Sequence, residues 1–255
     1  CQLNSLKLFE TYLGKKIALK IGLFCLSSCE GCMVEILNLE DKLLDLFEYI
    51  DIAESRILGI RTEEHLDVAF IEGCVMSDEE AEKLSEIRNR SKIVVALGDC
   101  ACSGGKFMFK DFAFKGTKLD LPPSRKNVKA DPIDKYVSVE YYLRGCPINN
   151  EEFLELVNNI ILSKIFREKT YSVCAECILY EKDCLIDKGY PCLGPITMGG
   201  CNAICPANGK YCYGCRGLYE DANIESLIEI FREKGIEVPK FLFELKEVVV
   251  GGEKK

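Results

Sequence analysis

Cysteine is the residue that most constrains this chain. Its 255 residues include 16 cysteines, and eight of these lie between Cys174 and Cys215, a stretch of 42 residues. The same stretch is rich in glycine and proline and has few large apolar side chains, so we do not expect an ordinary apolar core there. Small domains of this kind are held together by metal, because metal binding supplies folding free energy. Eight thiols in one segment predict two sites with four thiolate ligands each.

Charge and hydropathy exclude several classes of partner. The formal net charge is −8 at pH 7, so the field of the protein opposes binding to nucleic acid and to anionic lipid. No run of about 18 apolar residues is present that could span a membrane. The first residues lack the basic and apolar regions of a secretory signal. We therefore expect a cytoplasmic protein, in which metal ligation or redox chemistry is favoured over structural disulfides.

Apolar runs alternate with amphipathic patterns over the first two thirds of the chain. Strands are predicted at 16–24, 67–71, 92–97 and 136–139, and helices at 32–49, 77–90 and 152–166. Ser77 and Glu80 form a capping box for the second helix. The predicted apolar face of the first helix consists of Val34, Leu37, Leu43, Leu44 and Phe47. Alternating strands and helices indicate βαβ units, so the predicted fold class is α/β with a flavodoxin-like parallel sheet.

The pattern also predicts two domains. The flavodoxin-like domain is expected over residues 1–169. A small, mostly irregular cysteine-rich domain is expected over 170–255, together with a C-terminal helix at 223–234 and a tail.

Three loops at predicted strand ends carry cysteine. Cys29 and Cys32 follow the first strand, Cys100 and Cys102 follow the third, and Cys146 follows the fourth. Open α/β sheets bind ligands at the carboxyl ends of their strands, so four of these thiols are expected to converge, with either Cys100 or Cys102 as the third. Four thiolates suit zinc or an iron-sulfur cluster. The scattered spacing and the glycine-rich loops favour a cluster, and zinc stays the alternative.

Together these segments resemble a known family, the small subunits of nickel-iron hydrogenases. The resemblance is carried, in order, by Cys29-x2-Cys32, Gly98-x-Cys100-x4-Gly105, Gly145-Cys146-Pro147, Cys192-Leu-Gly-Pro-Ile-Thr-Met-Gly-Gly-Cys201 and Cys212-x2-Cys215. The all-cysteine pattern and the run from Cys201 to Pro206 are most similar to the cytosolic, group 3 kind, especially the delta subunits of archaeal sulfhydrogenases.

The resemblance implies three 4Fe-4S clusters held by twelve of the cysteines. It assigns the proximal cluster to Cys29, Cys32, Cys100 and Cys146; the distal cluster to Cys174, Cys177, Cys184 and Cys192; and the medial cluster to Cys201, Cys205, Cys212 and Cys215. The other four cysteines, for which a buried or surface thiol is the favoured interpretation, are Cys1, Cys25, Cys74 and Cys102.

By the same resemblance, this chain transfers electrons and has no nickel site of its own. Its implied partners are the nickel-iron large subunit and a pair of iron-sulfur and FAD/NAD(P)-binding subunits, in a heterotetramer or larger assembly. Two other classes stay open: an electron-transfer subunit of a complex I-related oxidoreductase, which usually lacks the eight-cysteine domain, and a zinc-binding interaction module. The sequence leaves open the final acceptor (NADP, NAD, F420, sulfur or ferredoxin) and the direction of hydrogen turnover.

Overall fold

The structure is a computed structural model that describes residues 18–105 and 130–243. Within these residues the chain forms two compact units, one of residues 18–104 and 131–167 and the other largely of residues 168–243. The predicted domains, residues 1–169 and 170–255, stay a prediction: that each part folds and functions separately. Cys1 and the C-terminal tail from residue 244 lie outside the described residues.

The first unit is built on a parallel sheet. Its strands are β1 (Leu19–Cys25), β2 (Ile50–Ser55), β3 (Leu66–Glu72), β4 (Ser91–Leu97) and β5 (Tyr141–Leu143). Their order across the sheet is β2-β1-β3-β4-β5, and every neighbouring pair is parallel. This is the strand order of the flavodoxin-like fold. The predicted α/β class and its parallel sheet are confirmed.

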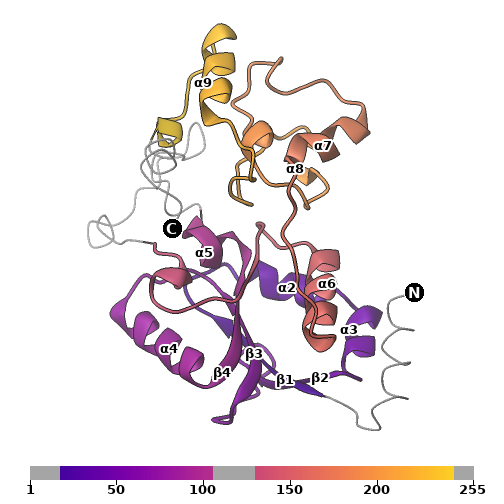
Figure 1. Ribbon diagram of the computed structural model, residues 1–255, viewed down its shortest axis with the longest axis vertical. Coiled ribbons are helices and arrows are strands. Elements are labelled where there is room, and N and C mark those ends of the chain that lie inside the picture. The colour runs from indigo at the N-terminus through magenta and orange to yellow at the C-terminus, as the bar shows by residue number, and fades with distance from the viewer. Residues whose placement is uncertain (1–17, 106–129, 244–255) are drawn as a thin grey trace. The chain divides into compact units, whose positions relative to one another are not determined.

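Helices cover both faces of this sheet (Figure 1). They are α2 (Gly31–Leu37), α3 (Asp41–Leu46), α4 (Asp78–Asn89), α5 (Gly98–Ser103), the short 3-10 helix η3 (Ile133–Lys135) and α6 (Asn150–Ile161). α2, α3 and α6 pack against one face, and α4 and α5 pack against the other. Successive residues of β4 belong alternately to the two cores, which explains why its sequence is continuously apolar.

One strand of the sheet was missed and another was misplaced. β2 was not predicted, because Asp51 and Glu54 interrupt its apolar residues and it lies at the edge of the sheet, paired with β1. The predicted strand at 136–139 is also wrong, since the strand is β5, which begins at Tyr141. Val137 and Val139 pack on the core without joining the sheet, and this contact explains their apolar character.

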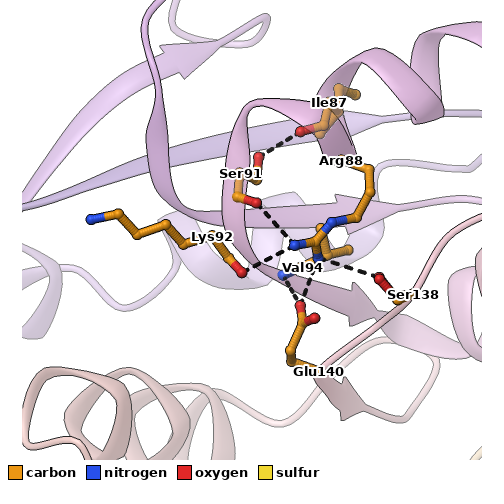
Figure 2. A network of polar contacts seen from close by, with 7 residues as sticks. All are labelled: Ile87, Arg88, Ser91, Lys92, Val94, Ser138 and Glu140. Carbon is orange, nitrogen blue, oxygen red and sulfur yellow. Dashed lines mark hydrogen bonds and ion pairs between the residues drawn. The ribbon is translucent and has the colours of Figure 1, made fainter.

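An arginine network fixes the segment that precedes β5 (Figure 2). The Arg88 guanidinium donates to the Glu140 carboxylate at 2.7 Å and to the Ser138 carbonyl at 3.3 Å. It also donates to the carbonyls of Ser91 and Lys92 at 3.0 and 3.1 Å. The same Glu140 carboxylate accepts the Val94 N–H at 2.7 Å. The end of α4 and the start of β4 are thereby tied to the segment that leads into β5.

The helices agree less closely with the sequence pattern. α4 begins after Ser77, whose hydroxyl accepts the Glu80 N–H at 3.3 Å as predicted. The predicted helix at 32–49 is two helices, because the backbone turns into a positive φ of 49° at Glu40. The break changes the buried face. Of its five predicted members only Leu43 is buried, while Val34, Leu37, Leu44 and Phe47 are 37–63% exposed. α6 ends at Ile161, five residues before the predicted end.

The second unit consists of short elements around its own apolar core. The elements are α7 (Val173–Cys177), the 3-10 helices η4 (Ile178–Tyr180) and η5 (Gly194–Ile196), α8 (Ile204–Ala207) and α9 (Ile224–Glu233). α9 begins at the Asn223 cap, as predicted, and buries Leu227 and Phe231 against Val173 and Leu193. The expectation that this part has no apolar core is wrong, because α9 supplies the large side chains that the cysteine-rich stretch lacks.

In the described residues, no helix is both long enough and apolar enough to cross a membrane.

Candidate metal centres

Four cysteines of the first unit lie in the segments that follow the carboxyl ends of three strands. Cys29 and Cys32 follow β1, with Cys32 in the first turn of α2. Cys100 lies in α5, directly after β4. Cys146 lies three residues beyond the end of β5. All four are therefore at the edge of the sheet where open α/β folds bind ligands.

These four thiols lie close enough to affect one another electrostatically. Burial, followed by the charges of Asp99 and Cys74 and then by those of Cys146 and Cys29, raises the pKa of Cys100 to about 12. Burial also raises the pKa of Cys32 above its usual range, with smaller contributions that include Cys146 and Cys100. A raised pKa favours the protonated thiol, and a cation beside Cys32 and Cys100 would favour the thiolate instead. The set therefore suits a bound group that brings positive charge, as iron or zinc does.

Glycines leave room for the sulfur atoms of this set. Gly98 has a φ of +81°, and a Cβ added there would overlap Cys32 Sγ. A Cβ at Gly31 would lie 3.3 Å from Cys29 Sγ. The Asp99 N–H donates to the Gly145 carbonyl at 2.7 Å, so the loop before Cys100 is held against the loop before Cys146. The backbone is thus shaped to bring bulky sulfur atoms close to the main chain.

A buried glutamate, Glu72, anchors the helix that carries Cys32. It is the last residue of β3 and is 2% exposed. Its carboxylate accepts the N–H groups of Cys32 at 3.2 Å and Met33 at 3.1 Å. Burial raises the pKa of Glu72, and these hydrogen bonds oppose that rise. We did not predict this residue from the sequence, where the available signal was one acidic residue at the end of an otherwise apolar strand.

The remaining described cysteines of the first unit are Cys102, Cys74 and Cys25, and the charge of Cys74 also acts on Cys100. Cys102 belongs to the apolar core on the α4 side of the sheet, and its thiol donates to the Ala96 carbonyl at 3.5 Å. Cys74 is fully buried, with its thiol 3.5 Å from the Ser27 carbonyl. Cys25 is partly buried against the core on the other face. These surroundings favour Cys100 over Cys102 as a ligand, and the ligand set itself stays a prediction.

In the second unit, Cys174, Cys177, Cys184 and Cys192 form another mutually close set. Burial, followed by the charges of the other three thiols, raises the pKa of Cys174 to about 12. A Cβ added at Gly194 would lie 3.3 Å from Cys174 Sγ and 3.6 Å from Cys192 Sγ. A glycine again allows the main chain to approach the sulfur atoms closely.

The remaining four cysteines, Cys201, Cys205, Cys212 and Cys215, are brought together less completely. Burial raises the pKa of Cys212 to about 12, and the charges of Cys192 and Cys201 contribute to this rise. Cys205 acts electrostatically on Tyr213, the residue after Cys212. The Cys212 N–H also donates to Cys192 Sγ at 3.3 Å, which joins this segment to the preceding set.

Glu176 joins another pair of cysteine-bearing segments, α7 and the loop from Gly200 to Ala203. It lies in α7 between Cys174 and Cys177, and its Oε1 accepts the Gly200 N–H at 2.5 Å. Its Oε2 accepts the Ala203 N–H at 2.9 Å and lies 4.0 Å from Cys201 Sγ. Burial and then the Glu176 charge raise the pKa of Cys201, whereas the buried Arg216 lowers it. Sequence reasoning missed Glu176, which gives no signal apart from its place between two cysteines.

The donor sets fit iron-sulfur clusters chemically. All fifteen described cysteines are free thiols, and twelve of them form the three predicted sets. As the side chains stand in residues 18–105 and 130–243, no three histidine, cysteine, aspartate or glutamate residues are arranged to hold a metal ion. The fit therefore rests on the all-thiol donors and on the glycines beside them, both of which are typical of clusters.

Known proteins resemble this chain over most of its length. The family model described as NADH ubiquinone oxidoreductase, 20 Kd subunit, matches residues 29–160. The delta subunit of sulfhydrogenase 2 from Pyrococcus furiosus is 39% identical over 84% of this chain and 93% of that protein. The gamma subunit of coenzyme F420 hydrogenase from Methanosarcina barkeri is 30% identical over 74% of this chain and 76% of that protein.

A solved structure shares the fold. One chain of the reduced, active Ni-Fe-Se hydrogenase from Desulfomicrobium baculatum aligns with a TM-score of 0.51 and 15% sequence identity. The alignment covers 78% of this chain and 94% of that chain. At this identity the likeness concerns the fold alone.

Proposed function

We propose a function from the premise that the chain belongs to the family of the NADH ubiquinone oxidoreductase 20 Kd subunit, which matches half of it, and to the hydrogenase subunits among its relatives. The chain is part of a hydrogenase, an oxidoreductase that acts on hydrogen. Its role is that of the small subunit of a cytoplasmic nickel-iron hydrogenase. In that role it carries electrons between the nickel-iron site of a large subunit and an acceptor subunit.

Three 4Fe-4S clusters would carry the electrons, each in a one-electron step. Cys29, Cys32, Cys100 and Cys146 would hold the proximal cluster. Cys174, Cys177, Cys184 and Cys192 would hold the distal cluster, and Cys201, Cys205, Cys212 and Cys215 the medial cluster. Two observations support this proposal best. The charges of neighbouring thiols affect one another within each of the first two sets, and each set has a glycine packed against its sulfur atoms.

The surrounding residues would set the properties of these sites. Buried side chains exclude water from Cys32, Cys192 and Cys212, which are all less than 9% exposed. Main-chain N–H groups lie near the sulfur atoms, as the Cys212 N–H does at Cys192. Hydrogen bonds to sulfur and solvent access are the means by which proteins tune the potential of a cluster.

The proposed partners are protein subunits. Four apolar side chains of α2, α3 and the C-cap of α3 are exposed in the isolated chain, namely Val34, Leu37, Leu44 and Phe47. Exposed apolar groups on this scale are typical of protein interfaces. They lie on the elements that follow Cys29, which supports a large subunit docked beside the proximal site. Iron-sulfur and FAD/NAD(P)-binding subunits would complete a heterotetramer or larger assembly, and the acidic net charge disfavours nucleic acid.

The proposal is tested on anaerobically purified holoprotein. Three 4Fe-4S clusters require about twelve iron and twelve sulfide per chain. Cys100→Ala should lose about four of these irons, or convert one cluster to a three-iron form, because a thiolate ligand is removed. Cys102→Ala is the matched control and should keep the iron content and the electron paramagnetic resonance spectrum. Stoichiometric zinc, about eight iron in the wild type, or the reverse result for the two variants would contradict the assignment.

A complex I-related electron-transfer subunit is the second candidate. The family match itself favours it, because the description of that family names a NADH ubiquinone oxidoreductase. The match stops at residue 160, however, and the eight cysteines of the second unit lie beyond it. Mass spectrometry of the copurifying subunits separates the two candidates, since only a hydrogenase brings a subunit with nickel bound.

A further inference from the structure

We propose that Glu176 is a positioning residue that holds the Cys201 loop in place and whose charge lowers the reduction potential of the cluster bound through Cys201. This inference rests on the proposed function, because it assigns a role to a residue beside one of the proposed clusters. Glu176 itself is not a ligand in this assignment.

Glu176 connects two segments that carry cysteines through hydrogen bonds to its carboxylate. The residue lies in α7, between Cys174 and Cys177. Its carboxylate reaches across to the loop that begins at Gly200 and accepts two main-chain N–H groups there, at 2.5 and 2.9 Å. The Tyr171 hydroxyl donates to the same carboxylate at 3.2 Å. Three donors from two segments therefore fix one carboxylate.

The loop held by this carboxylate has an unusual backbone. Gly200 has a φ of 106°, and Asn202 and Ala203 in the same turn have φ values of 53° and 43°. Residues with a Cβ seldom adopt positive φ, and such conformations persist where surrounding contacts hold them. Turns of this kind direct N–H groups into one concavity that suits an anion. Glu176 supplies that anion from within the chain, and Cys201 lies in the turn between the two bonded N–H groups.

The charge of Glu176 has a direct consequence for electron transfer. Its Oε2 lies 4.0 Å from Cys201 Sγ. When a cluster accepts one electron, its charge becomes more negative by one unit, so a fixed negative charge nearby opposes the reduction. Arg216 is 3% exposed and acts on the same thiol with the opposite sign. Removal of the Glu176 charge would remove a contribution opposite in sign to that of Arg216 and make reduction easier.

The test measures the midpoint potential of each cluster in the anaerobic holoprotein, by redox titration followed with electron paramagnetic resonance. The signal that Cys201→Ser alters identifies the cluster in question. Glu176→Gln should shift the ratio of reduced to oxidised cluster about tenfold towards the reduced form at a fixed potential. A tenfold change corresponds to about 59 mV for one electron, and this size is expected for a unit charge within about 10 Å at an effective dielectric constant of about 20.

Glu229→Gln is the matched control. Glu229 lies on the exposed face of α9, so this variant removes the same charge from the same unit away from the cysteines. It should leave every potential unchanged. If Glu176→Gln loses iron, Glu176→Asp decides, since it keeps the charge. Recovery of the cluster at the wild-type potential supports the inference, and failure to recover the cluster overturns it.

The inference and the proposed function fail in different ways. Wild-type holoprotein without three cluster signals refutes the proposed function and this inference with it. Three intact signals whose potentials are the same in the wild type and in Glu176→Gln refute the inference alone. A purely structural role would lower thermal stability and leave the potential unshifted, so the potential is the deciding measurement.

Discussion

Replacement of Gly98 by alanine should damage the proximal site through a single added methyl group. Gly98 has a φ of +81°, a conformation that costs a residue with a Cβ about 1–2 kcal/mol. The added Cβ would also overlap Cys32 Sγ, and overpacking of this kind costs about 1–3 kcal/mol. We therefore expect Gly98→Ala to lower the free energy of unfolding by about 2–5 kcal/mol in total. A shift of Cys32 that relieves the overlap would disturb its place in the proximal set.

Gly59→Ala provides the matched control within the same unit. Gly59 has a φ of +69°, and a Cβ added there meets no atom within 4 Å. This variant should lower the free energy of unfolding by only the conformational cost, about 1–2 kcal/mol, and it should keep its iron. Urea unfolding and iron analysis measure the two effects. Gly98→Ala should unfold at a lower urea concentration than Gly59→Ala and lose about four irons, one cluster's worth.

A double-mutant cycle shows whether Cys32 is the cause. In a Cys32→Ala background the overlapping sulfur is absent, so the extra cost of Gly98→Ala should disappear and leave only the conformational part. Equal stability losses for Gly98→Ala and Gly59→Ala, with full iron content in both, would refute the reasoning about close approach.

Two further predictions concern the first unit. Arg88→Ala removes the donors to Glu140, Ser138, Ser91 and Lys92 and should lower the free energy of unfolding by about 1–3 kcal/mol in urea titrations. Lys92→Ala, which breaks an ion pair whose lysine is 75% exposed, should cost less than about 1 kcal/mol, and the reverse ranking would contradict the role of the network. Burial raises the pKa of Asp67, but hydrogen bonds from Lys92 and the Lys20 N–H outweigh it, so the pKa in the folded state lies below 3.8. The charged form of Asp67 therefore stabilises the fold above the unfolded-state pKa. In thermal melts, the stability that the wild type has in excess of Asp67→Asn should vanish as the pH falls through the folded-state pKa. Excess stability that persists in acid would contradict this role of Asp67.

The sheet was predictable where strands are buried on both faces. The apolar runs of β1, β3 and β4 alternate with helical patterns, which predicts a parallel sheet, and the capping box located the start of α4. β2 escaped prediction because an edge strand with one exposed side alternates apolar and acidic residues. The register of β5 depends on the Arg88 and Glu140 contacts, which join residues far apart in sequence and leave no local pattern.

The candidate site was predictable to the extent that it consists of cysteine. Strand-end placement alone brought Cys29, Cys32, Cys100 and Cys146 to one edge of the sheet. That placement left Cys100 and Cys102 as alternatives, and the family resemblance favoured Cys100. The structure adds that Cys102 belongs to an apolar core. Glu72 and Glu176 were not predictable, because their partners are main-chain N–H groups, and main-chain donors look the same at every position of a sequence.

The core of the second unit shows a different limit of sequence reasoning. The stretch from Cys174 to Cys215 is poor in large apolar residues, which suggested a unit held by metal alone. The structure packs Val173, Leu193 and Ile196 against Leu227 and Phe231 of α9. The apolar surface is therefore shared between two segments, and the composition of one segment understates what the folded unit buries.

The two outer strands of the sheet affect how readily the isolated chain aggregates. Unpaired strand edges act as templates for aggregation, and short or irregular edge strands reduce that danger. In the described part of the chain, the sheet ends at β5 on one side, and this strand is only three residues long. On the other side it ends at β2, whose pairing with β1 shifts register between Ile21 and Gly22. Neither edge offers a long, regular ladder to a second molecule. The described edges of the sheet therefore give little opportunity for edge-to-edge pairing between copies of the chain.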